Sequence, residues 1–204
     1  MGSIDVSIFN IINGWSAGSI VLNNIMIFIS VYSMFILFAY VVLSWLFYKR
    51  KEKHRTILLA SANTFIISFI VSKILSLFIN HTPPYGAITN VNLLIEHDVN
   101  NSFPSYLAMM FFSVAFTIYF FTKAWNGGLF IFISIIVGIS QIWVGVKYPS
   151  DVLITLVICL IVALIISSIA RNTEALSKPI KAYNRQEAKL MGRDKDKKQE
   201  KSES

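Results

Sequence analysis

The sequence has little of what soluble domains are rich in. Only 14% of its 204 residues are charged, whereas 55% are hydrophobic and the mean hydropathy is +0.62. Its single cysteine, Cys159, excludes an internal disulfide and a metal site built on paired cysteines. It also lacks a glycine-rich phosphate loop and an H-E-x-x-H motif, so those soluble enzyme classes have no support. The composition favours an integral membrane protein.

Positive charge is scarce in the middle of the chain and clustered in two places. Of 18 Lys and Arg residues, five lie between Lys49 and Arg55, and ten lie from Arg171 onward. Both clusters flank hydrophobic runs, where Lys and Arg mark the cytoplasmic side of a membrane protein. The basic pI of about 9.5 therefore indicates topology, and we do not expect nucleic acid to be a partner.

Five apolar runs are long enough to cross a ~30 Å hydrocarbon core as helices. They cover residues 25–48, 57–79, 103–121, 129–146 and 151–170. Before them, apolar residues between Ile4 and Trp15 recur at helical spacing, which predicts a short helix at the membrane surface. We predict an all-α, polytopic membrane helix bundle with about five transmembrane helices plus this N-terminal interfacial helix. With the basic clusters inside, the N-terminus lies outside and the C-terminus is cytoplasmic.

The composition changes near Arg171, which divides the chain into two predicted parts. Residues 1–171 form the membrane domain, and residues 172–204 form a basic tail with too little apolar surface to fold by itself. We expect this cytosolic tail to be disordered and to act as a topology anchor. Attachment of the tail to anionic lipid head groups is the alternative.

Three polar segments interrupt the apolar pattern, at residues 81–85, 102–105 and 140–151. The predicted topology places all three on the outer side, where they can form a pocket. Ser105 precedes a helix whose free N–H groups and positive dipole end can hold an anion. Lys147 adds a positive charge, and Asp151 lies four residues later, where the two can pair on a helix.

Two of these segments resemble motifs of the type-2 phosphatidic acid phosphatase superfamily. Residues 102–105 read S-F-P-S, similar to the family's S-F-P-S-D-H, and residues 140–151 match its S-R-I-x-x-G-x-H-x-P-x-D without a gap. The resemblance is strongest to the bacitracin-resistance type of undecaprenyl-diphosphate phosphatase and covers nearly the whole chain. It implies a bacterial cell membrane protein that recognises a polyprenyl phosphate or diphosphate, a cell-wall lipid carrier, with no metal or cofactor.

The chain departs from the family at most of the positions that carry chemistry. Pro83 stands where the resemblance implies a phosphate-binding Arg, and Gln141 replaces a second Arg. Leu107 replaces the His that protonates the leaving group, and Lys147 replaces the nucleophilic His. Only the orienting acid, Asp151, remains with the serines. A Lys paired with an acid stays protonated and is a poor nucleophile, so hydrolysis by the family's route is not expected.

Other polar residues are candidates for binding or for rescue of the reaction. We expect Lys147, Ser105, Ser140 and Lys73 to contact phosphate. Lys73 lies inside an apolar run, where an ionisable residue indicates a function unless it extends to the interface. Three tyrosines can either bond phosphate or serve as interfacial aromatics: Tyr85, Tyr106 and Tyr148. His81 follows the second span and is a possible replacement nucleophile, although an exposed loop histidine is the simpler interpretation.

Three functions are therefore open. The first is a pseudo-enzyme that binds or shields a polyprenyl (di)phosphate in a resistance, immunity or cell-envelope role. The second is an active phosphatase with a non-standard nucleophile such as His81. The third is a non-catalytic scaffold that presents the cytosolic tail.

Overall fold

The computed structural model describes residues 3–47, 51–78, 81–95, 102–122, 125–172 and 177–190, and throughout these ranges the regular structure is helical. The elements are α1 (Ser3–Gly14), the 3-10 helix η1 (Trp15–Ala17), α2 (Ile20–Phe47), α3 (Lys51–Ser76), α4 (Pro84–Ala87), α5 (Tyr106–Thr122), α6 (Trp125–Trp143), α7 (Pro149–Asn172) and α8 (Ser177–Leu190). The predicted all-α fold class is confirmed.

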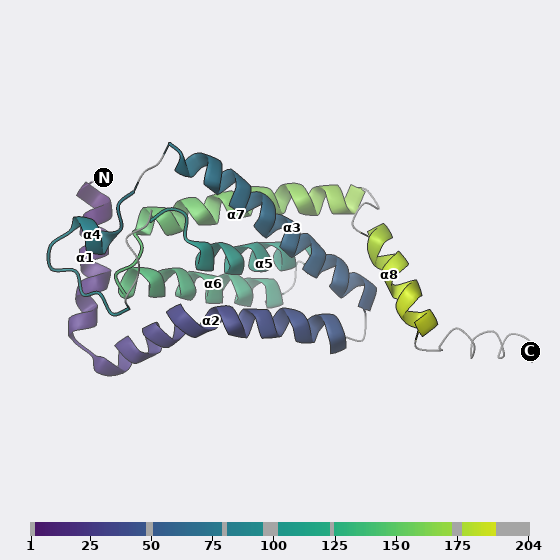
Figure 1. Ribbon diagram of the computed structural model, residues 1–204, viewed down its shortest axis with the longest axis horizontal. Helices are drawn as coiled ribbons and strands as arrows, with labels where there is room; N and C mark the ends of the chain where they lie inside the picture. Colours follow the sequence, from purple (N-terminus) through teal and green to yellow (C-terminus); the bar gives the residue numbers. More distant parts are fainter. Residues whose placement is uncertain are drawn as a thin grey trace, which may run out of the picture.

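Five helices form the bundle, with α2, α5, α6 and α7 running along its long axis and α3 crossing it obliquely (Figure 1). Within the ranges given above, α2, α3 and α7 are long and apolar enough to cross a membrane, and α5 and α6 are shorter apolar helices. Helix α2 begins five residues before the expected run and α3 six residues before it. The apolar runs thus identify the bundle helices but not their ends.

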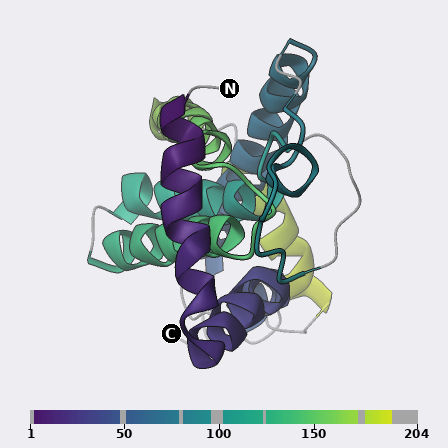
Figure 2. The same cartoon turned by 90° about the vertical axis from the view of Figure 1, so that its left-hand side faces the viewer.

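Helix α1 lies across one end of the bundle, roughly perpendicular to the other helices (Figures 1 and 2). Ile4 and Ile11 on one face are exposed, whereas Phe9 and Asn13 are buried against the bundle. The Asn13 side chain donates hydrogen bonds to the carbonyl oxygens of Asn92 (3.0 Å) and Trp143 (2.9 Å). The predicted N-terminal amphipathic helix is therefore present and is fastened to the loop at Asn92 and to the end of α6.

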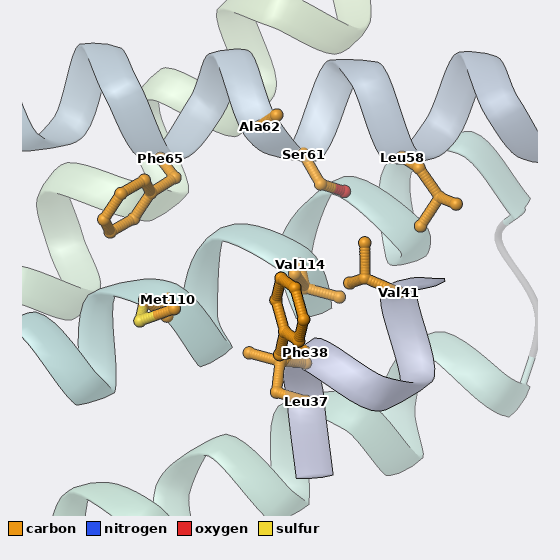
Figure 3. A pocket seen from close by; sticks show the side chains of 9 residues that line it. All are labelled: Leu37, Phe38, Val41, Leu58, Ser61, Ala62, Phe65, Met110 and Val114. Atoms are coloured by element: carbon orange, nitrogen blue, oxygen red, sulfur yellow. The ribbon is translucent and has the colours of Figure 1, made fainter. Parts of the chain in front are cut away.

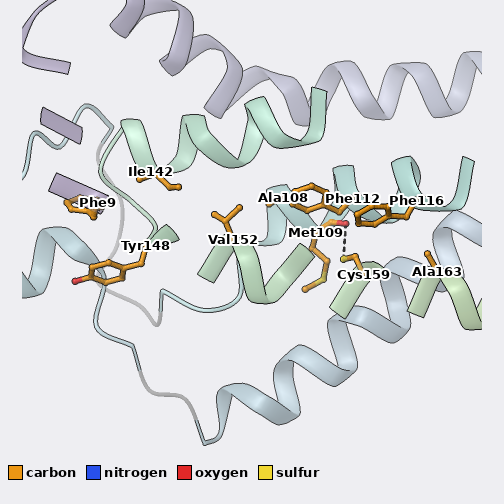
Figure 4. Packing of buried hydrophobic residues seen from close by; sticks show 10 residues of the cluster. All are labelled: Phe9, Ala108, Met109, Phe112, Phe116, Ile142, Tyr148, Val152, Cys159 and Ala163. Atoms are coloured by element: carbon orange, nitrogen blue, oxygen red, sulfur yellow. Dashed lines mark hydrogen bonds between the residues drawn. The ribbon is translucent and has the colours of Figure 1, made fainter. Parts of the chain in front are cut away.

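Helix α5 is the centre of the bundle, because its side chains from Phe111 to Ile118 are all buried. It packs against α3, α6 and α7, and the buried cluster in Figure 4 joins its residues to others from α1, α6 and α7. Cys159 of α7 is fully buried and donates a weak hydrogen bond to the carbonyl oxygen of Met109 (3.7 Å), consistent with a small buried side chain. Because α5 is close-packed along its length, its first residues, next to Ser105, are held in place.

Helix α8 occupies part of the region that we expected to be a disordered tail. It packs at the opposite end of the bundle from α1 (Figure 1). Arg55 of α3, only 1% exposed, forms a bidentate ion pair with Glu187, with Nη1–Oε2 at 2.6 Å and Nη2–Oε1 at 3.1 Å. The same guanidinium lies between the rings of Trp45 and Tyr183, 5.1 and 5.0 Å from their centroids.

The tail prediction missed this docking because composition alone does not show where a polar helix finds its partner. Ile180, Asn184 and Glu187 recur at helical spacing and face α3, where Ile180 is buried and Asn184 accepts a hydrogen bond from Arg55. Residues 191–204 lie outside the described residues, as does part of the first basic cluster. The division of the chain at residue 171 remains a prediction.

Candidate phosphate-binding site

The three polar segments meet around the carboxylate of Asp151, which is fully buried in the first turn of α7. Its Oδ1 lies 3.1 Å from Nδ1 of His81. Its Oδ2 accepts hydrogen bonds from the Ser102 hydroxyl (2.5 Å) and from the backbone N–H of Tyr148 (3.3 Å). The N-terminal end of a helix also favours a carboxylate there. Asp151 therefore organises the site by joining three segments that are distant in sequence.

Backbone contacts complete the junction between the loops. The N–H of Ser102 donates to the carbonyl oxygen of His81 (2.8 Å), and the rings of His81 and Tyr148 meet edge to face with centroids 6.3 Å apart. Asp5 of α1 accepts two hydrogen bonds from Ser150, at 3.0 Å from its N–H and 2.6 Å from its hydroxyl. The site thus lies beneath α1 at one end of the bundle.

Lys147 extends from the loop between α6 and α7 toward the segment that precedes α5. Its ammonium donates to the carbonyl oxygens of Ser102 and, at 3.4 Å, Pro104. Burial lowers the pKa of Lys147 from 10.5 to about 8, and the negative charge of Asp151 opposes part of this shift. Near pH 7 the side chain is therefore mainly a cation. Ser102 connects it to Asp151, because its carbonyl contacts the lysine while its hydroxyl contacts the acid.

Two buried hydroxyl groups near this cluster have no hydrogen-bond partner among the described residues: Ser105 Oγ and Tyr148 Oη. Burial, together with the nearby charges of Asp151 and Asp5, raises the pKa of Tyr148 to about 12, so its phenol remains an O–H donor. A buried unsatisfied donor is unfavourable unless something else accepts its hydrogen bond. Ser105 follows Pro104, whose carbonyl contacts Lys147, so an oxyanion beside Lys147 is a suitable acceptor for the Ser105 hydroxyl.

The other residues singled out from the sequence point elsewhere. Ser140 donates to the Val137 carbonyl within α6 (2.7 Å), and Gln141 donates to the Ser30 hydroxyl of α2 (2.5 Å). Lys73 is exposed beside the rings of Phe69 and Tyr106, Pro83 is buried in the turn before α4, and Leu107 packs among apolar residues of the bundle. The structure therefore brings together His81, Ser102, Ser105, Lys147 and Asp151.

Comparison with known proteins identifies the family to which the chain belongs. The PAP2 superfamily profile matches residues 58–174, which is more than half of the chain and includes both motif segments. The chain belongs to the PAP2 superfamily. It is 31% identical over 188 residues to the bacitracin transport permease protein BcrC of Bacillus licheniformis, covering 92% of this chain and 91% of that protein. It is also 31% identical over 160 residues to undecaprenyl-diphosphatase BcrC of Bacillus subtilis, covering 78% and 80%.

Two solved structures share the fold. LpxE of Aquifex aeolicus superposes with a TM-score of 0.64 at 24% identity, covering 81% of this chain and 95% of that one. The phosphatidylglycerolphosphate phosphatase of Bacillus subtilis superposes with a TM-score of 0.58 at 18% identity, covering 85% and 90%. The protein is thus a bacterial membrane protein of PAP2 type related to undecaprenyl-diphosphatases.

Metal ligands do not gather anywhere in the part of the chain that the structure describes, since no group of three or more His, Cys, Asp or Glu side chains comes together there. The site itself offers the Lys147 cation, the buried hydroxyl of Ser105, the start of helix α5, and the half-buried His81 beside the buried Asp151.

Proposed function

We propose that the protein binds the head group of a polyprenyl phosphate or diphosphate at Lys147 on the outer face of the membrane and does not hydrolyse it by the PAP2 route. The observation that carries this proposal is the place of the Lys147 ammonium. It contacts the Ser102 and Pro104 carbonyls at the motif position where the family's nucleophilic His is expected. A protonated amine can attract phosphate but has no lone pair with which to attack phosphorus.

The other departures from the family motifs also disfavour hydrolysis. Phosphoryl transfer needs a nucleophile, a proton donor for an alkoxide leaving group and cations on the equatorial oxygens. Leu107 cannot donate a proton, a loss that matters for a polyprenyl monophosphate, whose leaving group is an alkoxide. Gln141 carries no charge and its amide is engaged by Ser30 in α2. Removing a single preorganised donor of this kind typically lowers turnover about 10²- to 10³-fold, so the losses together favour binding without turnover.

Binding is supported by the donors that remain. Lys147 has a positive charge, the hydroxyls of Ser105 and Tyr148 are buried without a partner among the described residues, and the N–H groups at the start of α5 favour an anion. The names of the two BcrC relatives suggest that the anion belongs to undecaprenyl diphosphate or its monophosphate. A role in resistance or immunity at the cell envelope follows if the bound lipid is shielded from other molecules.

A second candidate function is favoured by the contact between His81 Nδ1 and Asp151 Oδ1 at 3.1 Å. An acid that orients an imidazole is the usual way to prepare a histidine nucleophile. In this alternative His81 attacks the terminal phosphorus, the phosphoanhydride bond breaks and polyprenyl phosphate leaves with the electron pair. Water then hydrolyses the phosphohistidine. A phosphate leaving group is a weak base, so this reaction would not require the acid missing at Leu107.

The test is to measure phosphate release from undecaprenyl diphosphate and the ligand-induced thermal shift on one detergent-purified preparation. We expect no release from the wild type and a thermal shift that Lys147→Ala removes. Lys181→Ala, on the exposed face of α8, is the matched lysine control and should keep the shift. Lys147→His tests whether the family's nucleophile alone restores release.

Other outcomes identify the alternatives. Release that persists in Lys147→Ala and disappears in His81→Ala supports the phosphatase with a relocated nucleophile. Neither release nor a thermal shift contradicts both proposals and leaves the membrane scaffold, for which deletion of residues 172–204 should then abolish the cellular phenotype.

A further inference from the structure

Helix α7 begins at the candidate site without a capping side chain from its own loop. Tyr148 precedes the helix, at the position where Ser, Thr, Asp or Asn usually accepts a hydrogen bond from the first turn. Its ring lies instead between Phe9 and His81, with centroids 5.6 and 6.3 Å away (Figure 4). The first residue, Pro149, has no N–H, so the first free backbone donor of α7 belongs to Ser150.

Asp5 of α1 accepts this donor, although 145 residues separate Asp5 from Ser150 in the chain. Its Oδ1 lies 3.0 Å from the Ser150 nitrogen, and its Oδ2 lies 2.6 Å from the Ser150 hydroxyl. A carboxylate at this place also meets the positive end of the α7 dipole. Asp5 therefore performs, from another helix, the role that a neighbouring residue usually has at a helix start.

The capping arrangement is shared between Asp5 and Asp151. Asp151 is the third residue of α7, and its Oδ2 accepts a hydrogen bond from the N–H of Tyr148 at 3.3 Å, as the third residue of a capping box does. In an ordinary capping box, the residue before the helix supplies the other acceptor. Here Asp5 supplies it, so the first turn that carries Asp151 depends on a side chain of α1.

Helix α1 has other contacts that keep it docked when Asp5 is changed. Phe9 is buried against the bundle, and Asn13 donates hydrogen bonds to the carbonyl oxygens of Asn92 and Trp143. Removal of the Asp5 carboxylate is therefore a local perturbation of the α7 start and not a loss of the whole helix.

The substitution also leaves the cavity elsewhere in the bundle intact. This cavity has a volume of about 180 Å³, and its lining residues, drawn in Figure 3, come from α2, α3 and α5. Asp5 contacts α7 and not these helices through Ser150. An effect of Asp5 on anion binding would therefore act through the start of α7.

We propose that Asp5 is a positioning residue for the head-group site, because it caps α7 from α1 and so holds Asp151 in place. The identity of the anion rests on the function proposed above. Ser102 transmits the effect, since its hydroxyl donates to Asp151 while its carbonyl accepts a hydrogen bond from Lys147. A shift of Asp151 thus changes the surroundings of the lysine that binds the anion.

The charge of Lys147 gives a readout that a loss of stability alone would not change. Burial lowers the pKa of Lys147 to about 8, and the negative charge of Asp151 opposes part of this shift. The other titratable groups packed around this loop are His81, Tyr148 and Asp5. If Asp151 moves away, the pKa of Lys147 falls further, and binding of an anion is lost at a lower pH. A protein that is only less stable would bind with an unchanged pH midpoint.

The experiment measures dissociation constants of undecaprenyl phosphate for the full-length protein in one detergent, between about pH 6.5 and 9 around the shifted pKa of Lys147. Asp5→Ala removes both hydrogen bonds, whereas Asp5→Asn removes the charge and keeps an oxygen that can accept the Ser150 N–H. Ser150→Ala removes only the hydroxyl bond. Asn10→Ala is the control, at an exposed position on the same helix.

We expect Asp5→Ala to weaken binding at pH 7 about fivefold, the usual effect of losing a helix cap. The midpoint of its pH profile should move down by about half a unit. Asp5→Asn should recover most of both effects, and Ser150→Ala should show a smaller shift in the same direction. Adding Ser150→Ala to Asp5→Ala should change nothing more, since the two residues act through one contact. Asn10→Ala should bind as the wild type does.

Three outcomes would overturn the inference: an unchanged midpoint in Asp5→Ala, additive effects of the Asp5 and Ser150 changes, or equal effects of Ala and Asn at position 5. The last would show that charge and not capping is responsible. If Asp5→Ala does not fold, Ser150→Ala decides, and an unchanged midpoint in that variant counts against the proposal.

Failure of the proposed function appears differently. If Lys147→Ala leaves binding of undecaprenyl phosphate intact, the head-group site at Lys147 is wrong. The cap is then tested by hydrogen exchange of the ligand-free protein, in which Asp5→Ala should speed exchange of the Ser150 amide and Asn10→Ala should not. Unchanged exchange in Asp5→Ala would show that Asp5 does not hold the start of α7.

Discussion

Raising the pH from 7 to 9 should weaken binding of a polyprenyl phosphate roughly tenfold, because Lys147 loses its proton in this range. Its pKa of about 8 leaves about nine-tenths of the side chains charged at pH 7 and about one-tenth at pH 9. The phosphate already carries its second charge above a pKa of about 6, so the ligand contributes little to the change. Tyr148, whose pKa is raised to about 12, also stays protonated throughout.

The assay is a series of dissociation constants measured by titration at half-unit steps of pH. Lys147→Arg is the decisive variant, because a guanidinium remains charged over the whole range and should give a flat profile. A wild-type profile that is flat between pH 7 and 9 would refute the reasoning. So would a wild-type slope that Lys147→Arg reproduces, since another group would then be titrating.

The ligand-free protein should become more stable as the pH rises, whereas binding of the lipid becomes weaker. Folding lowers the pKa of Lys147 from 10.5 to about 8, so between these values the unfolded chain binds more protons than the native state. The free energy of unfolding therefore rises with pH in this window, by about 1–2 kcal/mol after allowance for partial exposure of the side chain. General alkaline denaturation would instead lower stability and binding together, which separates the two explanations.

Three further substitutions test the architecture. Glu187→Ala should leave the buried Arg55 without its ion pair, a loss of about 3–5 kcal/mol that hydrogen exchange would report as faster opening of α8; unchanged protection there would contradict the docking. Gly145→Ala should lower the free energy of unfolding by about 1–2 kcal/mol, measured as a lower thermal midpoint, because φ is +88° and an added Cβ lies 3.0 Å from the nearest atoms. Gly14→Ala has open space around the added Cβ and should be neutral or stabilising. Asp151→Ala should destabilise the ligand-free protein by about 3 kcal/mol in thermal unfolding, and a variant as stable as wild type would show that its three contacts are dispensable.

The sequence predicts the helical bundle well because the bilayer imposes a strong constraint. Backbone groups in hydrocarbon must bond within their own segment, so long apolar runs become helices whatever their detailed order. The position of α1 also follows from pattern, since Ile4 and Ile11 share one face while Phe9 and Asn13 share the other. Helix α8 does not follow, because its stability depends on contacts with Arg55 and Trp45, which precede it by more than a hundred residues.

The site was predictable as a meeting of segments but not as a set of contacts. Motif spacing identified Lys147, Ser105 and Asp151 as site residues. It did not predict that the side chain of Gln141 points away from them and donates a hydrogen bond to Ser30 of α2. Nor does any local signal in the sequence reveal that His81 lies against Asp151, since seventy residues separate them. The partner of a buried acid is decided by how loops close over the end of the bundle, and one sequence does not encode that in a local pattern.

The pattern of retained and altered residues itself has a structural reason. Asp151 accepts hydrogen bonds from Ser102 and from the Tyr148 backbone and contacts His81, so the fold needs it whether or not a reaction takes place. Ser102 likewise links Asp151 to Lys147. Leu107 and Gln141, at positions where the family motifs have charged or titratable groups, instead satisfy neighbours within the bundle. Asp151 and Ser102 thus have contacts that hold the loops together, so their presence does not by itself indicate hydrolysis and is compatible with the binding function proposed above.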